Sequence, residues 1–215
     1  MSRTGWRALF AALPDGLTAA AFAAIWLSPF VFGEAGVRTA MLVMLLEFFL
    51  IHATGFFTAF VMAPGLARGR RVAAILGLSL FYLLMIGALA SSFGEWWPLL
   101  AFGWLVAAKL AWVFARRPAG DEEDDRGAIA WAGSGVAYVL GAFATAVPPV
   151  PRLGMTEALQ PGFGLGDDAG GLWMDEPQRV IAFGALYFGL LCLGKLLAAL
   201  FSGKEKPRPE PGSLV

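Results

Sequence analysis

Four ionisable side chains lie inside long apolar runs of this 215-residue chain: Glu47, His52, Lys109 and Lys195. An ionisable group in the hydrocarbon of a membrane costs several kcal/mol, so each needs a partner or a water-filled cavity. A carboxyl, an imidazole and an ammonium are also groups that exchange protons or attract ions. We therefore predict that these four residues form a polar centre, with Glu47 as its proton- or cation-responsive group.

Helix geometry places these groups at related depths. Glu47 lies ten residues from one end of the run 37–63, which is about 15 Å along a helix. Lys109 and Lys195 lie about seven residues, or about 10 Å, from the opposite side. Because helical side chains lean toward the N-terminus of their helix, a Lys–Glu pair beside His52 is geometrically plausible. The alternative is that both lysines reach the membrane surface and Glu47 makes a structural contact with His52.

The run 37–63 has two faces that suit contact with other helices. Thr54 and Thr58 return to the face of Glu47, and His52 lies roughly 140° away. Small residues that permit close helix approach share the face of His52: Gly55, Ala59 and Ala63. We therefore expect this helix at the centre of the bundle, surrounded by protein.

A second polar stripe runs along residues 128–147, where Ser134 and Tyr138 recur at helical spacing. Together with Thr54 and Thr58, these side chains are candidates for lining a polar cavity. The alternative is that the stripe only packs helices tightly.

The motifs that usually identify catalysis or nucleotide binding are missing, including GxxxxGK[ST], HExxH, CxxC and GxSxG. His52 is the only histidine and Cys192 the only cysteine. We therefore predict no catalytic residue, cofactor or metal site, and an enzyme is the least favoured class. The net charge of zero gives no reason to expect a nucleic-acid partner.

Composition predicts what must position these residues. Hydrophobic residues make up 58% of the chain and charged residues only 15%, which is typical of a membrane protein. Six apolar runs are long enough for membrane-spanning helices: 16–33, 37–63, 72–93, 96–115, 128–147 and 180–202. The predicted fold is therefore all-α, a polytopic bundle over 16–202, followed by a disordered cytoplasmic tail, 203–215.

The first run has features of a signal peptide: Arg3 and Arg7 precede an apolar stretch in which Ala21-Phe22-Ala23 suits cleavage. Pro14-Asp15-Gly16 interrupts that stretch, so we expect the segment to be retained. The prediction is an interfacial cytoplasmic segment over 1–15, a turn at Pro14–Gly16, and then the first span.

Loop charges predict the orientation, because cytoplasmic loops carry an excess of Lys and Arg. With the N-terminus inside, eleven basic residues fall on the cytoplasmic side and three outside; the three are Arg38, Arg152 and Arg179. This predicts six spans with both ends in the cytoplasm. Frequent Ala, Gly and Arg suggest a bacterial source and hence an inner-membrane location.

Two connections are long enough to have structure of their own. The acidic run 121–125 is expected to be a solvated, mobile segment on the cytoplasmic side. The outer loop 148–179 is rich in Pro and Gly and ends in a helix-start pattern, in which Asp175 caps, Pro177 occupies the first turn and Gln178 lies three residues beyond the cap.

These features favour a small permease or channel-like membrane protein built around the polar centre. The alternative is a non-catalytic scaffold or accessory subunit of a larger membrane complex, in which the polar residues only lock helix packing. Six spans are few for a transporter that works alone, so the first interpretation favours a homo-oligomer. The expected partners are the lipid bilayer and other membrane protein chains.

Overall fold

The computed structural model describes residues 3–63, 65–115, 121–165 and 171–202, and within these ranges every regular element is helical. Two short elements interrupt the last connection between long helices. The elements in chain order are α1 (Arg3–Leu27), α2 (Gly36–Met62), α3 (Arg68–Phe93), α4 (Trp97–Ala115), α5 (Asp121–Ala146), η1 (Glu157–Phe163), α6 (Leu172–Asp175) and α7 (Pro177–Ser202).

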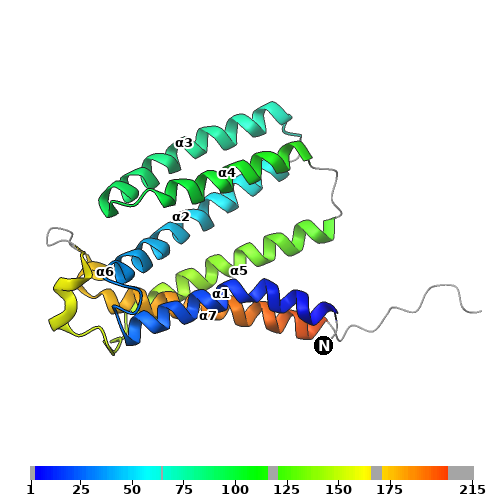
Figure 1. The fold of residues 1–215 in the computed structure, drawn as a ribbon. Helices are drawn as coiled ribbons and strands as arrows, with labels where there is room; N and C mark the ends of the chain where they lie inside the picture. The colour runs from blue at the N-terminus through cyan, green and yellow to red at the C-terminus, as the bar shows by residue number, and fades with distance from the viewer. Residues whose placement is uncertain (1–2, 64, 116–120, 166–170, 203–215) are drawn as a thin grey trace, which may run out of the picture.

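The six long helices run back and forth between two ends of the molecule (Figure 1). At one end lie η1, α6 and the turn between α1 and α2; we call this the loop end. At the other, the terminal end, α1 begins and α7 ends (Figure 1).

Five of these helices are long and apolar enough to cross a membrane: Leu9–Leu27, Gly36–Met62, Arg68–Phe93, Trp97–Phe114 and Pro177–Leu200. This confirms the predicted all-helical class, and the length and composition of the five helices are compatible with an integral membrane protein. The sixth span, predicted within α5, and the orientation with both ends in the cytoplasm stay predictions.

The helices form two lobes that diverge toward the terminal end (Figure 1). Lobe I contains α1, α5, α7 and the first half of α2, and large side chains fill its core. These include Met41, Leu42, Met44, Phe163, Phe183 and Tyr187. Lobe II contains α3, α4 and the second half of α2, around a core that includes Ala53, Phe57, Ile75, Tyr82, Ile86 and Phe102.

Helix α2 contributes to both cores along its length, because its 27 residues pass from one lobe into the other. The last residue of α3, Phe93, also belongs to the core of lobe I. Helix α2 also packs against α1, α3, α4, α5 and α7. The prediction that this helix occupies the centre is therefore confirmed. Not every face is covered, however, and the exposed face is described below.

The predicted turn at Pro14–Gly16 is wrong, and so is a first span that begins at residue 16. Helix α1 is continuous from Arg3 to Leu27 and contains Pro14. Proline removes one backbone donor, but the freed carbonyls of a membrane helix find other partners. The carbonyl freed by Pro14 is that of Phe10, four residues earlier. Thr18 Oγ1 donates to the Pro14 carbonyl itself, at 2.9 Å. Packing against α7 is close beside this point, since a Cβ on Gly16 would lie 3.1 Å from Cys192 Sγ.

The acidic run 121–125 is also not the predicted loop. These residues form the beginning of α5, which therefore starts seven residues before the predicted span. Carboxylates stabilise the N-terminal turns of a helix through its dipole, so the composition that suggested a solvated loop also suits a helix start. The predicted disordered tail, 203–215, lies outside the described residues.

The loop end is held together by hydrogen bonds between the long loop and the helix ends. Trp26 Nε1 donates to the Pro151 carbonyl at 2.9 Å, and Gly154 N donates to the Trp26 carbonyl at 3.1 Å. A Cβ on Gly154 would lie 2.0 Å from the Leu27 carbonyl oxygen, so this close approach requires glycine. The loop predicted over 148–179 is thus packed against α1.

Helix α7 begins at Pro177, as predicted, but its start is organised by Glu176 rather than by Asp175. The Glu176 carboxylate accepts hydrogen bonds from Gln178 Nε2 and from the Arg179 guanidinium. Arg179 also donates to three carbonyls that end α5, those of Thr145, Ala146 and Pro148. Asp175 instead ends the short helix α6.

Candidate functional site

Two polar contacts join α7 to its neighbours within lobe I. Tyr187 Oη donates to Glu47 Oε1 on α2 at 2.8 Å. Eight residues further along α7, Lys195 Nζ lies 2.5 Å from Asp15 Oδ2 on α1. All four side chains belong to helices long and apolar enough to span a membrane, where an unpaired charge is costly.

These four residues differ in their exposure. Tyr187 is fully buried, and Glu47 is partly buried. The Asp15 side chain is 14% exposed, whereas the Lys195 side chain is 47% exposed and provides the most accessible part of the group. The charges of Asp15 and Lys195 both act on Glu47. We call Asp15, Glu47, Tyr187 and Lys195 the carboxyl cluster.

The formal charges of the carboxyl cluster do not cancel. It contains two carboxyl groups and one ammonium, and Asp15 is the one that pairs with Lys195. The hydrogen bond from Tyr187 is directional but neutral, so it does not compensate the charge of an ionised Glu47. With Glu47 ionised, the cluster carries one net negative charge inside the bundle, and binding a proton removes it.

Buried aromatic rings close the loop-end side of the carboxyl cluster. Tyr138 on α5 donates through its hydroxyl to the Met44 carbonyl at 2.8 Å. Its ring packs edge-on against Tyr187 and against Phe183, with centroids 5.4 and 4.8 Å apart. Phe183 also contacts Trp173 of α6. Tyr138 is therefore a buried packing residue here, and it lines no exposed surface.

Lys109 belongs to a separate polar contact in lobe II. Its Nζ donates to Thr58 Oγ1 at 2.9 Å and lies 5.0 Å from the centroid of the Trp112 ring. Thr58 in turn donates to the carbonyl of Thr54 at 2.7 Å. In the described part of the chain, Lys109 has no carboxylate within ion-pair distance.

His52 is exposed and makes its contacts within α2. Its Nδ1 lies 2.8 Å from the Phe48 carbonyl oxygen, and its ring lies 4.2 Å from the Phe48 ring. Phe56 and Ala59 share this exposed side. The prediction that protein surrounds α2 is therefore wrong on the His52 face, because neighbouring helices cover its other sides.

Gly55, which was predicted to share the face of His52, is not exposed in the same way, because a large side chain covers it. The indole of Trp131 on α5 packs over Gly55, where a Cβ would lie 2.2 Å from a ring atom. Trp131 Nε1 donates to the Ile51 carbonyl at 2.8 Å. Ser134 donates to the Trp131 carbonyl of its own helix, so it is not held by another element.

The structure thus distributes the predicted polar centre over three places. Glu47 and Lys195 both belong to the carboxyl cluster, but the predicted direct Glu–Lys pair is not formed. Lys109 and His52 lie in other contacts. Whether the four predicted residues act together stays a prediction.

Sequence reasoning missed two members of the cluster, Asp15 and Tyr187. Asp15 was assigned to a turn because Pro14 precedes it, although a continuous helix would have placed it inside an apolar run. Tyr187 occupies the same apolar run as Lys195 and lies eight residues before it. A search for polar side chains along that run could have found Tyr187, but not its partner.

Comparison with known protein families, with curated proteins and with solved structures finds no match for this chain.

Proposed function

We propose that this protein is a small membrane permease or channel-like protein that passes protons through its carboxyl cluster, with Glu47 as the group that binds and releases them. The observation that carries the proposal is the charge of the cluster: it contains two carboxyls, from α1 and α2, and one ammonium, from α7, which pairs with Asp15 and not with Glu47. A membrane-embedded carboxyl without a compensating cation is a typical proton-binding group of pumps and transporters.

The surroundings of Glu47 support access from one side. Toward the terminal end lies Lys195, whose side chain is nearly half exposed. Toward the loop end lie the buried rings of Tyr138, Tyr187 and Phe183. A proton therefore reaches Glu47 past the Asp15–Lys195 pair, and passage to the loop end requires these rings to move. Such one-sided access fits a permease with alternating access better than a continuously open pore.

Flux measurements on purified protein test this proposal. Vesicles that contain the protein and an internal pH-sensitive dye are given a proton gradient, with valinomycin and K⁺ to dissipate charge. Wild type is expected to acidify the vesicle interior faster than empty vesicles do, and Glu47→Gln is expected to remove this difference. The matched control is Glu95→Gln, since Glu95 pairs with Arg38 at the loop end, away from the cluster. Equal flux from wild type and Glu47→Gln overturns the assignment.

A scaffold or accessory subunit is the second candidate, and a separate observation favours it. The same polar side chains join helices directly: Tyr187 to α2, Lys195 to α1, Tyr138 to α2 and Trp131 to α2. Such interhelical hydrogen bonds stabilise membrane bundles without any transport. If Glu47→Gln lowers stability but no variant changes proton flux, the scaffold is the better description.

The orientation, the bacterial inner-membrane location and a homo-oligomeric state are part of the same proposal. A Cys192→Ser background with a single cysteine at position 69 or 165 tests the orientation. In intact cells, an impermeant thiol reagent is expected to label position 165, beside η1, and to spare position 69, near the start of α3. The reverse pattern places the terminal end outside.

A further inference from the structure

Lys109 is a membrane lysine whose charge is not compensated by any carboxylate among the residues that the structure describes. One of its three N–H donors is used by Thr58, at 2.9 Å. The Trp112 ring, 5.0 Å away, attracts the ammonium through its π face. Two donors remain for a ligand, and Lys109 is only partly buried. Its counterpart Lys195, by contrast, is paired with Asp15.

The depth of Lys109 matches the boundary between hydrocarbon and lipid headgroups. Helix α2 has 27 residues and is about 40 Å long, against about 30 Å of hydrocarbon. If it is centred, about 5 Å of α2 projects beyond the hydrocarbon at each end. Thr58 lies four residues, or about 6 Å, before the last residue of α2. The ammonium bound to Thr58 therefore lies at the edge of the hydrocarbon, next to the layer of lipid phosphates.

Lobe II itself is basic at this end. Helix α3 begins at this end of lobe II with Arg68, Arg70 and Arg71, and the Arg71 guanidinium donates to the Ala63 carbonyl just beyond α2. Among the described residues of lobe II, the acidic residue is Glu95, which lies at the opposite end. Basic residues near the membrane surface attract anionic headgroups.

From this geometry we propose that Lys109, Thr58 and Trp112 form a binding site for the phosphate of an anionic glycerophospholipid in the leaflet at the terminal end. The ammonium donates to a phosphate oxygen, the hydroxyl of Thr58 fixes the position of the ammonium, and the indole of Trp112 packs beside the headgroup. A lipid is the better source than free phosphate, because its phosphate already lies at this depth. The site is separate from the carboxyl cluster and does not depend on the proposed transport.

Native mass spectrometry tests the proposal. The protein is reconstituted in nanodiscs with equal amounts of phosphatidylcholine and phosphatidylglycerol. It is then released in the mass spectrometer, and the amount of each lipid that stays bound is measured. Wild type is expected to retain phosphatidylglycerol preferentially. Lys109→Met is expected to lower that retention about fivefold, the value of one basic group near the surface. Lys109→Arg keeps the charge and is expected to retain the lipid.

The matched control is Arg70→Gln, which removes an exposed charge from the same end and is expected to lower retention less than Lys109→Met does, because it leaves the contact between the ammonium and the phosphate in place. Inorganic phosphate added to phosphatidylcholine nanodiscs separates the two phosphate sources, and no bound phosphate is expected there. Thermal unfolding in detergent shows whether Lys109→Met is folded, and Lys109→Arg provides the comparison if it is not. Equal retention by wild type and a folded Lys109→Met overturns the site, and so does binding of free phosphate without the lipid.

Discussion

The two lobes use polar residues in different ways. In lobe I, polar side chains bind across helix interfaces: Lys195 to Asp15, Tyr187 to Glu47 and Arg179 to the end of α5. In lobe II, most contacts are apolar and aromatic, as between Phe57, Tyr82 and Phe102. Its one intramembrane lysine bonds to a hydroxyl and an aromatic face.

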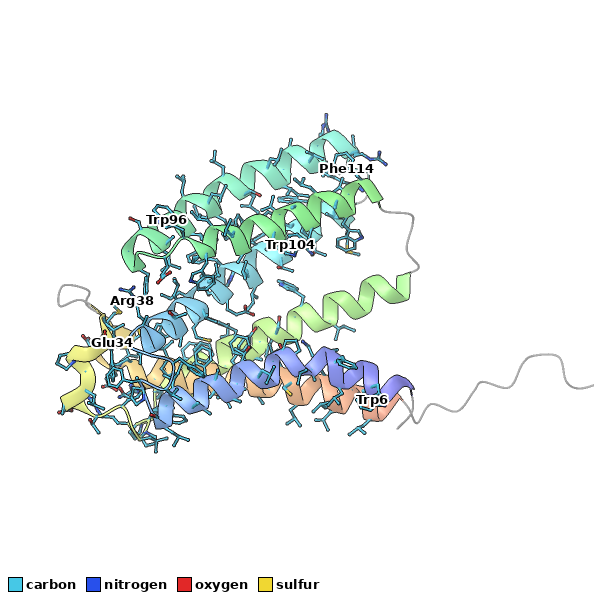
Figure 2. The ribbon with its side chains drawn as sticks, in the orientation of Figure 1. Trp6, Glu34, Arg38, Trp96, Trp104 and Phe114 are labelled. Carbon is cyan, nitrogen blue, oxygen red and sulfur yellow. The ribbon has the colours of Figure 1, made fainter. Side chains whose placement is uncertain are left out.

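This difference indicates that the two lobes have different roles within one bundle. Charges that are paired inside a membrane bind helices strongly, because each group stranded by the loss of its partner is costly. Lys109, at the boundary, has no carboxylate partner within the described ranges, so it binds no other helix that strongly and is available to a ligand. Lobe I therefore contains the candidate transport site, and lobe II offers an outward-facing apolar surface. Trp96, just before α4, and Trp104 and Phe114 on α4 are exposed large side chains of this lobe (Figure 2).

The largest expected effect concerns the packing of α1 on α7 in lobe I. A Cβ on Gly184 would lie 2.2 Å from ring atoms of buried Phe22, whereas nothing lies within 4 Å of a Cβ on Gly77 in lobe II. Gly184→Leu should lower the free energy of unfolding by about 3 kcal/mol or more, because overpacking displaces the ring. Gly77→Leu should be nearly neutral. Titration with a denaturing detergent measures both, and equal effects would show that α1 does not pack on α7 this closely.

The second prediction concerns the Asp15–Lys195 pair. Lys195→Met leaves Asp15 largely buried without its cation, which should cost about 2 kcal/mol, less than a fully buried pair because Lys195 is half exposed. Asp15→Asn in the same chain should recover part of the loss. A double-mutant cycle on unfolding free energies measures the coupling. Additive single effects would mean that the pair does not contribute to stability.

Hydropathy was enough to predict the helical class, because the length of an apolar run is fixed by membrane thickness. Of the six predicted spans, five correspond to helices that are long and apolar enough to cross a membrane. Hydropathy failed at Pro14, where local proline chemistry favours a turn but tertiary packing on α7 keeps the helix continuous. The sequence could not predict which residue pairs with Glu47, and the reason is different. That choice depends on the rotation of α7 relative to α2, and rotation follows from the summed packing of side chains along both helices.

A third prediction compares two tyrosines, one in each lobe. Tyr187→Phe removes the hydrogen bond to Glu47 and should cost about 1–2 kcal/mol, because a partly buried carboxyl loses its donor. Tyr82 packs among Phe57 and Phe102 without a hydrogen bond in the described part of the chain, so Tyr82→Phe should change stability by less than about 0.5 kcal/mol. Similar losses would contradict the difference between the lobes. Unfolding titrations under identical conditions measure both, and Tyr187→Phe should also alter proton flux if Glu47 carries the proton.

The smallest expected effect is that of Lys109→Met, which gives the sharpest contrast with Lys195→Met. Both changes remove one intramembrane ammonium, but only the second strands a carboxylate. Thr58 keeps its own bond to the Thr54 carbonyl after Lys109 is lost, so no buried group is left without a partner. In phosphatidylcholine nanodiscs or neutral detergent, Lys109→Met should therefore change the free energy of unfolding by about 0.5 kcal/mol or less.

With an anionic phospholipid, wild type alone should gain stability, since a ligand that binds only the folded state stabilises it. A large loss of unfolding free energy for Lys109→Met in neutral lipid would show that Lys109 holds the helices of lobe II together. The two lobes would then be more alike than their contacts indicate.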